Sequence, residues 1–190
     1  MSVTIPIASL AQAENLSAQR PDLFTVGKAL VQQDESGNWL IFCFDDTVGA
    51  DIQALDETDA RVKLANYSGL KRWTTETAGI MSSGHPIKTD GDSQRKTALV
   101  DSNFINGIQT GTVEWKLADG TFVSADAALV HQFNLDIQSH ITACYNAEQA
   151  CYDAIQAGSV TTNADVDNFY ASIPILPSGT LPASAMRRYA

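Results

Sequence analysis

The side chains best suited to metal binding or nucleophilic chemistry are three histidines and three cysteines: His85, His131, His140, Cys43, Cys144 and Cys151. His131 and His140 lie in one strongly helical segment, about two and a half turns apart, so they face nearly opposite directions. One helix therefore cannot form a zinc pair from them. His140 and Cys144 are one turn apart and could contact one metal ion, but no third and fourth ligands are apparent. The pattern predicts no metal site.

Other motifs that could support metal binding or catalysis have simpler structural interpretations. The segment from Thr89 to Ser93 hints at a calcium loop, but it lacks the later bidentate glutamate, and helix capping explains it better. Ser82 and Ser83 precede His85, yet adjacency in sequence is not a catalytic triad. The sequence has no Walker loop, nucleophile elbow or dinucleotide fingerprint, and no defensible carboxylate pair for glycoside hydrolysis. We predict no catalytic, cofactor-binding or metal-binding residues, and hence no enzyme.

Composition narrows the class of protein further. The net charge is -10 and the sequence pI is about 4.5, so an acidic surface disfavours nucleic acid as a partner. A hydrophobic fraction of 44% is enough for a real core. Neither a secretory signal nor a membrane-spanning segment is predicted. The sparse, odd set of cysteines predicts free, buried thiols in a protein made in a reducing cytoplasm.

Apolar runs and turn formers predict a β-hairpin in the first third of the chain. Two apolar runs within 23–44 flank residues 34–38, which are rich in turn formers. The second run, from Trp39 to Phe44, is apolar on both faces and should pair centrally or pack beneath other elements. A helix is expected next, from its N-cap at Asp56 to about Ala78.

The middle of the chain predicts two further hairpins on either side of a helix. Short β-runs are expected at 79–81 and 86–88, followed by a helix capped by Asp90 or Asp92. The apolar residues expected on the buried face of this helix are Val100, Phe104, Ile105 and Ile108. Alternation within 113–123 predicts a hairpin, and Asp119-Gly120 is the dipeptide that a type I′ turn prefers.

A long helix should then run from its cap at Ser124 to about Ala157, with Gly158 ending it. The stripe predicted to be buried comprises Leu129, Phe133, Ile137, Ile141, Cys144, Cys151 and Ile155. Such a helix spans roughly 50 Å, more than a compact domain of this size needs to cover. We expect part of it to pack on another chain or on a symmetry copy.

The two ends of the chain look different from the rest. Residues 1–22 are small and polar and predict an N-terminal arm without a core of its own. Residues 159–190 contain three prolines together with large apolar side chains, which favours an extended arm docked on a partner. The residues predicted to bind that partner are Phe169, Tyr170, Ile173, Ile175 and Leu176. The alternative is an arm that docks back on its own domain.

The predicted fold class is therefore α+β, with small β-hairpins packed against helices, one long C-terminal helix and extended terminal arms. The predicted organisation is an N-terminal arm (1–22), a hairpin with the start of a helix as an attachment region (23–69), an α+β domain (70–158) and the C-terminal arm (159–190).

Several short motifs recur in a particular order between about 70 and 158. They are Trp73, Glu76 and Gly79-Ile80; Gly84 to Asp90 leading into Ser93-Gln94; Val113 to Lys116 with Ala118-Asp119-Gly120 and Phe122-Val123; and the long helix holding His140, Ala143 and Cys144. In these features the segment resembles a domain of unknown function found in bacteriophage and prophage tail-fibre proteins and in small proteins encoded beside tail-fibre genes. The family pattern usually has a charged residue at Gly91, so that turn is expected to differ here.

The resemblance implies a structural component of a bacteriophage tail, associated with the tail fibre or baseplate and located in the virion. Its implied partners are other tail proteins, with a homo-oligomer also open, and the family has no catalytic residues to carry over. A tail-fibre assembly chaperone that leaves the finished particle is the alternative. The predicted arms favour the structural component, because extended segments often lock subunits to their neighbours. The regions outside the match are expected to determine where the protein attaches.

Overall fold

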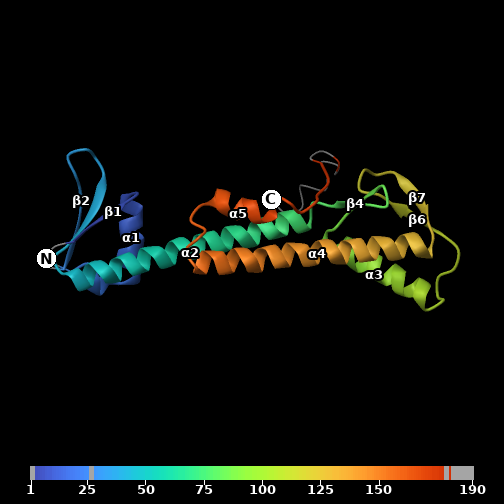
Figure 1. The fold of residues 1–190 in the computed structure, drawn as a ribbon, viewed down its shortest axis with the longest axis horizontal. Coiled ribbons are helices and arrows are strands. Elements are labelled where there is room, and N and C mark those ends of the chain that lie inside the picture. Colours follow the sequence, from blue (N-terminus) through green and yellow to red (C-terminus); the bar gives the residue numbers. More distant parts are fainter. Residues whose placement is uncertain (1–2, 26–27, 178–179, 181–190) are drawn as a thin grey trace. The chain divides into compact units, whose positions relative to one another are not determined.

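The computed structural model describes residues 3–25, 28–177 and 180, and in this part of the chain it contains five α-helices and three small antiparallel sheets (Figure 1). The predicted α+β class is confirmed. The chain divides into two compact units, Met1–Lys63 and Leu64–Ala190, each with its own hydrophobic core. No helix within the described residues has the length and apolar character needed to cross a membrane.

The first unit is built on a three-stranded antiparallel sheet in the order β1-β3-β2. Its strands are β1 (Val3–Ile7), β2 (Ala29–Gln33) and β3 (Trp39–Cys43). The predicted hairpin is confirmed, and its second strand is central, which explains why that strand is apolar on both faces. The carboxylate of Asp34 closes the turn between β2 and β3 by accepting hydrogen bonds from the backbone N–H of Ser36 at 2.9 Å and of Asn38 at 2.8 Å.

The segment before residue 23 is part of this unit, so the predicted N-terminal arm over 1–22 is wrong for the described residues. Besides β1, the segment forms α1 (Leu10–Gln19) and the start of a short 3-10 helix, Pro21–Leu23. Ser9 caps α1 by accepting from the backbone N–H of Gln12. The buried core consists of Ile5, Ile7, Ala13, Leu16, Leu23, Ile41, Cys43, Val48 and Ile52. The apolar residues of 1–22 thus find partners that lie far along the chain.

Helix α2 (Asp46–Glu76) begins well before Asp56, the N-cap predicted from the sequence. The carboxylate of Asp45 accepts a hydrogen bond from the backbone N–H of Thr47 at 2.6 Å, and this contact lowers the pKa of Asp45 by stabilising its charged form. The first turns of α2 bury Val48 and Ile52 in the core of the first unit. The boundary between the two units falls inside this helix.

The second unit begins with the last turns of α2 and two short strands, β4 (Ile80–Ser82) and β5 (His85–Ile87), which pair antiparallel as predicted. Helix α3 (Gly91–Ile105) follows, and Asp90 caps it by accepting from the backbone N–H groups of Asp92 and Ser93. One of the two expected caps is therefore confirmed.

The buried face of α3 differs from the one predicted. Of the four residues predicted to be buried, Val100 and Phe104 are half-buried, while Ile105 and Ile108 are exposed. The polar residues Thr97 and Asp101 are buried instead. The physical reason is that Asp101 has polar partners on the neighbouring helix, so a polar face of α3 can be covered without leaving groups unpaired.

The predicted hairpin after α3 is confirmed as β6 (Val113–Lys116) paired with β7 (Phe122–Ala125), but its turn is not type I′. A type I′ turn needs positive φ at both central residues, and in this turn only Gly120 has one, at +93°. The backbone N–H of Leu117 donates to Thr121 and that of Gly120 donates to Leu117. These bonds describe a three-residue loop whose last position is the glycine.

Helix α4 (Ala127–Gln156) begins two residues later than its predicted cap suggested, because Asp126 rather than Ser124 accepts from the backbone N–H of Leu129. Gly158, with φ of +75°, ends it as predicted. The buried residues of α4 are Val130, Phe133, Ile137, His140, Cys144, Cys151 and Ile155. Leu129 and Ile141 are partly buried beside them. Five of the seven residues of the predicted stripe are therefore buried, and the stripe contributes to both hydrophobic clusters of this unit.

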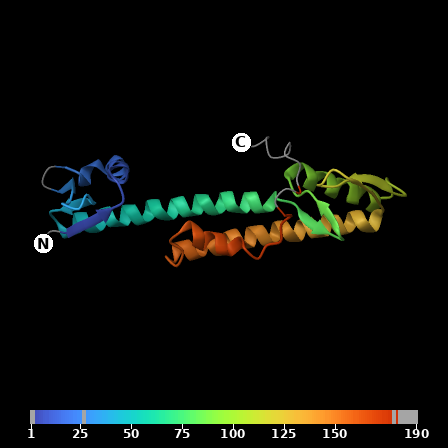
Figure 2. The ribbon, with the colours of Figure 1, turned by 90° about the horizontal axis from the view of Figure 1, so that it is seen from above.

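Helix α4 is not the last helix, and the segment after it is not an extended arm over its described residues. Helix α5 (Asn163–Tyr170) lies against α4 (Figures 1 and 2) and begins with a capping box between Thr162 and Asp165. Further along, the backbone N–H of Leu176 donates to the carbonyl of Gly79 at 2.9 Å. The prolines follow α5 instead of preventing it. Residues 178–179 and 181–190 of the predicted arm lie outside the described residues.

Candidate functional site

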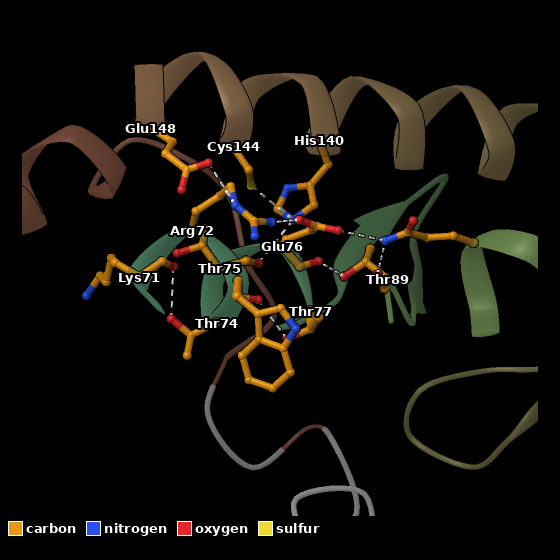
Figure 3. Close-up of polar contacts among 12 residues, drawn as sticks. Lys71, Arg72, Thr74, Thr75, Glu76, Thr77, Thr89, His140, Cys144 and Glu148 are labelled. Carbon is orange, nitrogen blue, oxygen red and sulfur yellow. Dashed lines mark hydrogen bonds and ion pairs between the residues drawn. The ribbon is translucent and has the colours of Figure 1, made fainter. Parts of the chain in front are cut away.

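A cluster of polar side chains fills the interior of the second unit where the last turns of α2 meet α4 (Figure 3). Arg72 on α2 is at its centre, and its side chain is only 17% exposed. It forms an ion pair with Glu76 one turn later and a second with Glu148 on α4, where Nε lies 2.9 Å from Oε2. The Glu76 and Glu148 side chains are 13% and 30% exposed. One cation therefore balances two carboxylates in a place where solvent screens charge weakly.

The guanidinium group of Arg72 is also held by an aromatic ring. Its Cζ atom lies 4.7 Å from the centre of the Tyr145 ring, which is within the range of a cation–π contact. The Nε–H is near Glu148 but is not directed at it, so Nε makes no hydrogen bond and the contact is an ion pair only. Arg72 thus links α2 to two residues of α4.

The C-terminal end of α2 is sealed by side chains from the following segment. The hydroxyl of Thr89 donates to the carbonyl of Glu76 and accepts from the backbone N–H of Gly79 at 2.9 Å. The amide of Gln94 donates to Oε1 of Glu76 at 3.1 Å and to the carbonyl of Thr89 at 2.7 Å. Backbone groups that the helix end leaves unpaired are therefore satisfied within the protein.

Gly79, three residues after the end of α2, has no room for a side chain. Its φ is +80°, and a Cβ atom built there would lie 2.7 Å from Cδ1 of Leu176 and 2.8 Å from the carbonyl oxygen of Ile87. Both distances are shorter than real Cβ contacts. The close approach lets Leu176 cover the end of the helix, so this glycine is needed for its conformation and for its size.

His140 and Cys144 lie side by side on α4, with Nε2 and Sγ 3.8 Å apart. Nε2 also lies 3.1 Å from the backbone carbonyl of Thr75, and because a carbonyl only accepts, Nε2 must carry the proton of that bond. This nitrogen cannot then remove a proton from the thiol. Burial, followed by the nearby charge of Glu76, raises the pKa of Cys144 to about 11. The pair therefore joins α4 to α2 and has the wrong proton arrangement for a cysteine nucleophile.

A second polar contact joins α3 to α4. The carboxylate of Asp101 is buried, and Nδ1 of His131 lies 3.0 Å from one of its oxygens. Nδ2 of Asn134 donates to the other oxygen at 2.8 Å. The prediction that His131 and His140 face apart is confirmed, since they contact α3 and α2 respectively. Among residues 3–25, 28–177 and 180, no group of three or more His, Cys, Asp or Glu side chains could hold a metal ion.

Two hollows mark the surface of this unit. One, of about 350 Å³, lies between α2 and α4 and has the rings of Tyr145 and Tyr152 beside Ser68 and Glu148. The other, of about 420 Å³, lies between α3 and β6, and we call it the α3–β6 groove. The residues that line the α3–β6 groove are Ile87, Lys88, Ser93, Lys96, Thr97, Val100, Val113, Glu114, Trp115, Lys116, Phe133 and Ile137. The groove thus combines an apolar floor with three lysines.

The five residues predicted to bind a partner lie mostly within the second unit itself. Tyr170 and Leu176 are buried, while Phe169 and Ile173 pack partly buried against the same core, and only Ile175 is largely exposed, at 51%. The hydroxyl of Tyr170 donates to the backbone carbonyl of Ser68 at 3.0 Å and lies 2.8 Å from its Oγ. Of the two arrangements expected from the sequence, these residues adopt the second, in which the segment docks on its own domain. Partner binding by Ile175 stays a prediction.

Sequence reasoning missed the charged residues of the polar cluster and the lysines of the α3–β6 groove. The spacing of Arg72 and Glu76 at one helical turn signals an ion pair within α2. Nothing local indicates that Glu148, far along the chain, joins them. The three groove lysines likewise come from three separate elements, so only the fold brings them together.

Comparison with known proteins adds a family to this geometry. Residues 59–171 match the family model described as "Domain of unknown function (DUF4376)". No curated protein and no solved structure matches the chain. The matched range takes in the polar cluster, the α3–β6 groove and α5, and it extends the resemblance seen over about 70–158 in both directions. Because this match covers more than half of the chain, the protein belongs to the DUF4376 family of domains of unknown function.

Proposed function

We propose that this protein is a structural component of a bacteriophage tail, associated with the tail fibre or baseplate, and that it attaches other tail subunits. The observation that carries the proposal is its two-unit organisation. The family domain occupies most of the second unit, while the first unit folds around a separate core and lies almost wholly outside the family match. A domain joined to a second folded module is suited to connecting two partners. The resemblance to tail-associated proteins is the reason for proposing a phage tail as the assembly in which the protein works.

The polar cluster is consistent with a structural role. Arg72, His140 and Thr89 each hold two elements together, and the thiol of Cys144 stays protonated at neutral pH. These side chains are therefore used to position helices. In the proposed role the chain works by protein–protein contact, in the virion, after synthesis in the host cytoplasm.

The test is quantitative mass spectrometry of purified tails. Particles are banded on a density gradient and washed in high salt to remove loosely bound protein. The expected result is a fixed, stoichiometric ratio of this chain to a major tail subunit, unchanged by the wash. A chain abundant in the infected cell but missing from washed particles would instead identify an assembly chaperone that leaves after binding fibre chains.

Cross-linking of the same particles tests the attachment role. We expect cross-links from each of the two units to other tail proteins. If every cross-link from both units goes to a single partner, the protein does not connect two subunits.

A further inference from the structure

The α3–β6 groove has a charge that contrasts with the rest of the molecule. Three of the six lysines of this chain line it, namely Lys88, Lys96 and Lys116, although the net charge is -10. Lys88 and Lys96 form no ion pair with any described residue, and Nζ of Lys116 lies 5.9 Å from the centre of the Phe122 ring. Glu114 is the only carboxylate in the lining. With three lysines and one glutamate, the lining carries a net charge of +2.

One wall of the groove is the edge of β6 that faces away from β7, and this edge is open as far as Lys116. Just beyond the strand, the backbone N–H of Ala118 donates to the carbonyl of Pro86 at 2.8 Å. All four residues of β6 contribute to the lining and none of β7 does, so the groove lies on the side of β6 away from its partner. The hydrogen bond from the backbone N–H of Leu117 to the carbonyl of Thr121 shows which residue pairs of the β6–β7 hairpin are hydrogen-bonded, since bonded and non-bonded pairs alternate along the strands. By that alternation, the backbone N–H and C=O of Glu114 and Lys116 point away from β7, toward the groove. Neither residue makes another backbone hydrogen bond to a described residue.

The floor of the groove is apolar. Phe133 and Ile137 of α4 lie beneath it and are almost completely buried, so the apolar surface that the groove presents is that of the half-buried Val100, Val113 and Trp115. The Trp115 ring packs 6.1 Å, centre to centre, from the Phe133 ring. An open strand edge beside an apolar floor is suited to binding an extended peptide as an added strand. In that binding mode the backbone hydrogen bonds supply affinity, and pockets accept every second side chain of the peptide. A four-residue edge matches a peptide of about 13 Å at ~3.3 Å per residue.

We propose that the α3–β6 groove binds an extended segment of another protein chain in which carboxylate and apolar side chains alternate. The segment pairs with the open edge of β6, places its apolar side chains on the floor and directs its carboxylates to the three lysines. The inference rests on the proposed attachment function, and it names the kind of partner segment that the family domain takes.

The test uses the purified full chain and a fluorescent synthetic peptide of alternating glutamate and valine. The peptide is expected to bind saturably, and to bind less tightly as salt is raised, because salt screens the lysine contacts. The same peptide with glutamine in place of glutamate should bind about 5- to 10-fold less tightly. Equal binding of the two peptides, or no saturable binding of either, overturns the proposal.

Variants locate the binding. The double variant Lys88→Gln with Lys96→Gln should weaken binding about 5- to 10-fold, while Lys63→Gln, on the first unit, should leave it unchanged. Glu114→Pro removes one outward N–H at an open edge, where proline is tolerated, and should abolish binding. If that variant melts early, a peptide with methylated backbone nitrogens gives the same test on the unaltered protein. Binding that survives these changes refutes strand addition.

The remaining outcomes separate this inference from the proposed function. Self-association of the chain that Glu114→Pro removes would assign the edge to a second copy and overturn the proposal. A chain that is stoichiometric in purified tails but does not bind the peptide refutes the groove alone. A chain that binds the peptide but is absent from tails keeps the groove and refutes the structural role.

Discussion

Tyr170 is the residue whose replacement best tests how the C-terminal segment packs. It is 3% exposed in a cluster with Leu64, Cys151, Ile155 and Val166. Removing the ring leaves a cavity between α2, α4 and α5. Removing only the hydroxyl leaves the ring in place. The two changes therefore separate packing from hydrogen bonding at one position.

The expected losses follow from these contacts. Tyr170→Phe loses two short contacts to Ser68 and leaves a buried hydroxyl with fewer partners, which should lower the free energy of unfolding by about 1–2 kcal/mol. Tyr170→Ala also loses the burial of the ring, and the total loss should be about 4 kcal/mol. Tyr152→Ala is the matched control, because Tyr152 is largely exposed on α4, and its cost should stay within about 0.5 kcal/mol.

The assay is urea unfolding of the isolated protein followed by tryptophan fluorescence. Trp39 reports on the first unit, so the measurements are made in a Trp39→Phe background, in which the remaining tryptophans, Trp73 and Trp115, belong to the second unit. The separation matters because two units that unfold independently do not share one transition. The result is the free energy of unfolding of the second unit alone.

A small effect would refute the reasoning. An arm that is ordered only by a partner contributes nothing to the isolated protein, so Tyr170→Ala would then cost no more than Tyr152→Ala. Truncation after Gly158 makes the same distinction on a larger scale. We expect the truncated second unit to lose its cooperative transition, because Val160, Val166 and Leu176 also leave its core.

Three further predictions concern the polar cluster and the end of α2. Arg72→Met should lower the free energy of unfolding by about 2–3 kcal/mol, since two carboxylates lose their cation, and adding Glu148→Gln should restore part of it in urea melts. The fold raises the pKa of Cys144 to about 11 from an ordinary value of 9.0. The stability gained from the buried, protonated thiol is therefore complete below pH 9 and is lost as the pH rises toward 11. Cys144→Ala should flatten that part of a curve of stability against pH, and an unchanged slope would contradict the assignment. Gly79→Ala should destabilise by at least about 2 kcal/mol more than Gly84→Ala in thermal melts, because both glycines have φ of +80° but only Gly79 has neighbours within 4 Å of a Cβ; equal costs would show that the close approach is unimportant.

Local sequence signals determined the types and order of most elements. The turn formers at 34–38 and the Asp119-Gly120 dipeptide each marked a hairpin that the structure contains. Alternating and helical spacings identified β6 and the buried stripe of α4. These features depend on neighbours within a few residues, which is the range over which backbone preference and side-chain spacing act.

The sequence located the ends of the helices less well, because more than one residue near each end is able to act as the N-cap. Asp56 and Ser124 are both good capping residues by type, yet the helices begin after Asp45 and Asp126. Either residue could have capped a helix locally. Burial of Val48 and Ile52 in the first unit favours the earlier start of α2, and such burial involves residues distant in the sequence.

Tertiary structure alone decided the fate of the two terminal segments. A run such as 1–22 or 159–176 has too few apolar residues for a core of its own, and its prolines and small residues suggest an extended chain. Whether its apolar side chains pack on the same protein or on a partner depends on a surface that is absent until the remaining elements assemble. In the first unit β3 provides that surface, and in the second α2 and α4 provide it.

The sequence by itself thus determined an acidic α+β protein with hairpins, a long amphipathic helix and membership signals for its family, because each of these depends on composition or short-range spacing. The polar cluster around Arg72, the proton arrangement of His140 and Cys144, and the α3–β6 groove with its three lysines were decided only by the tertiary structure. Each of these sites joins side chains from different elements. Their meeting depends on how the hydrophobic faces of those elements pack, and no local spacing in the chain records that packing.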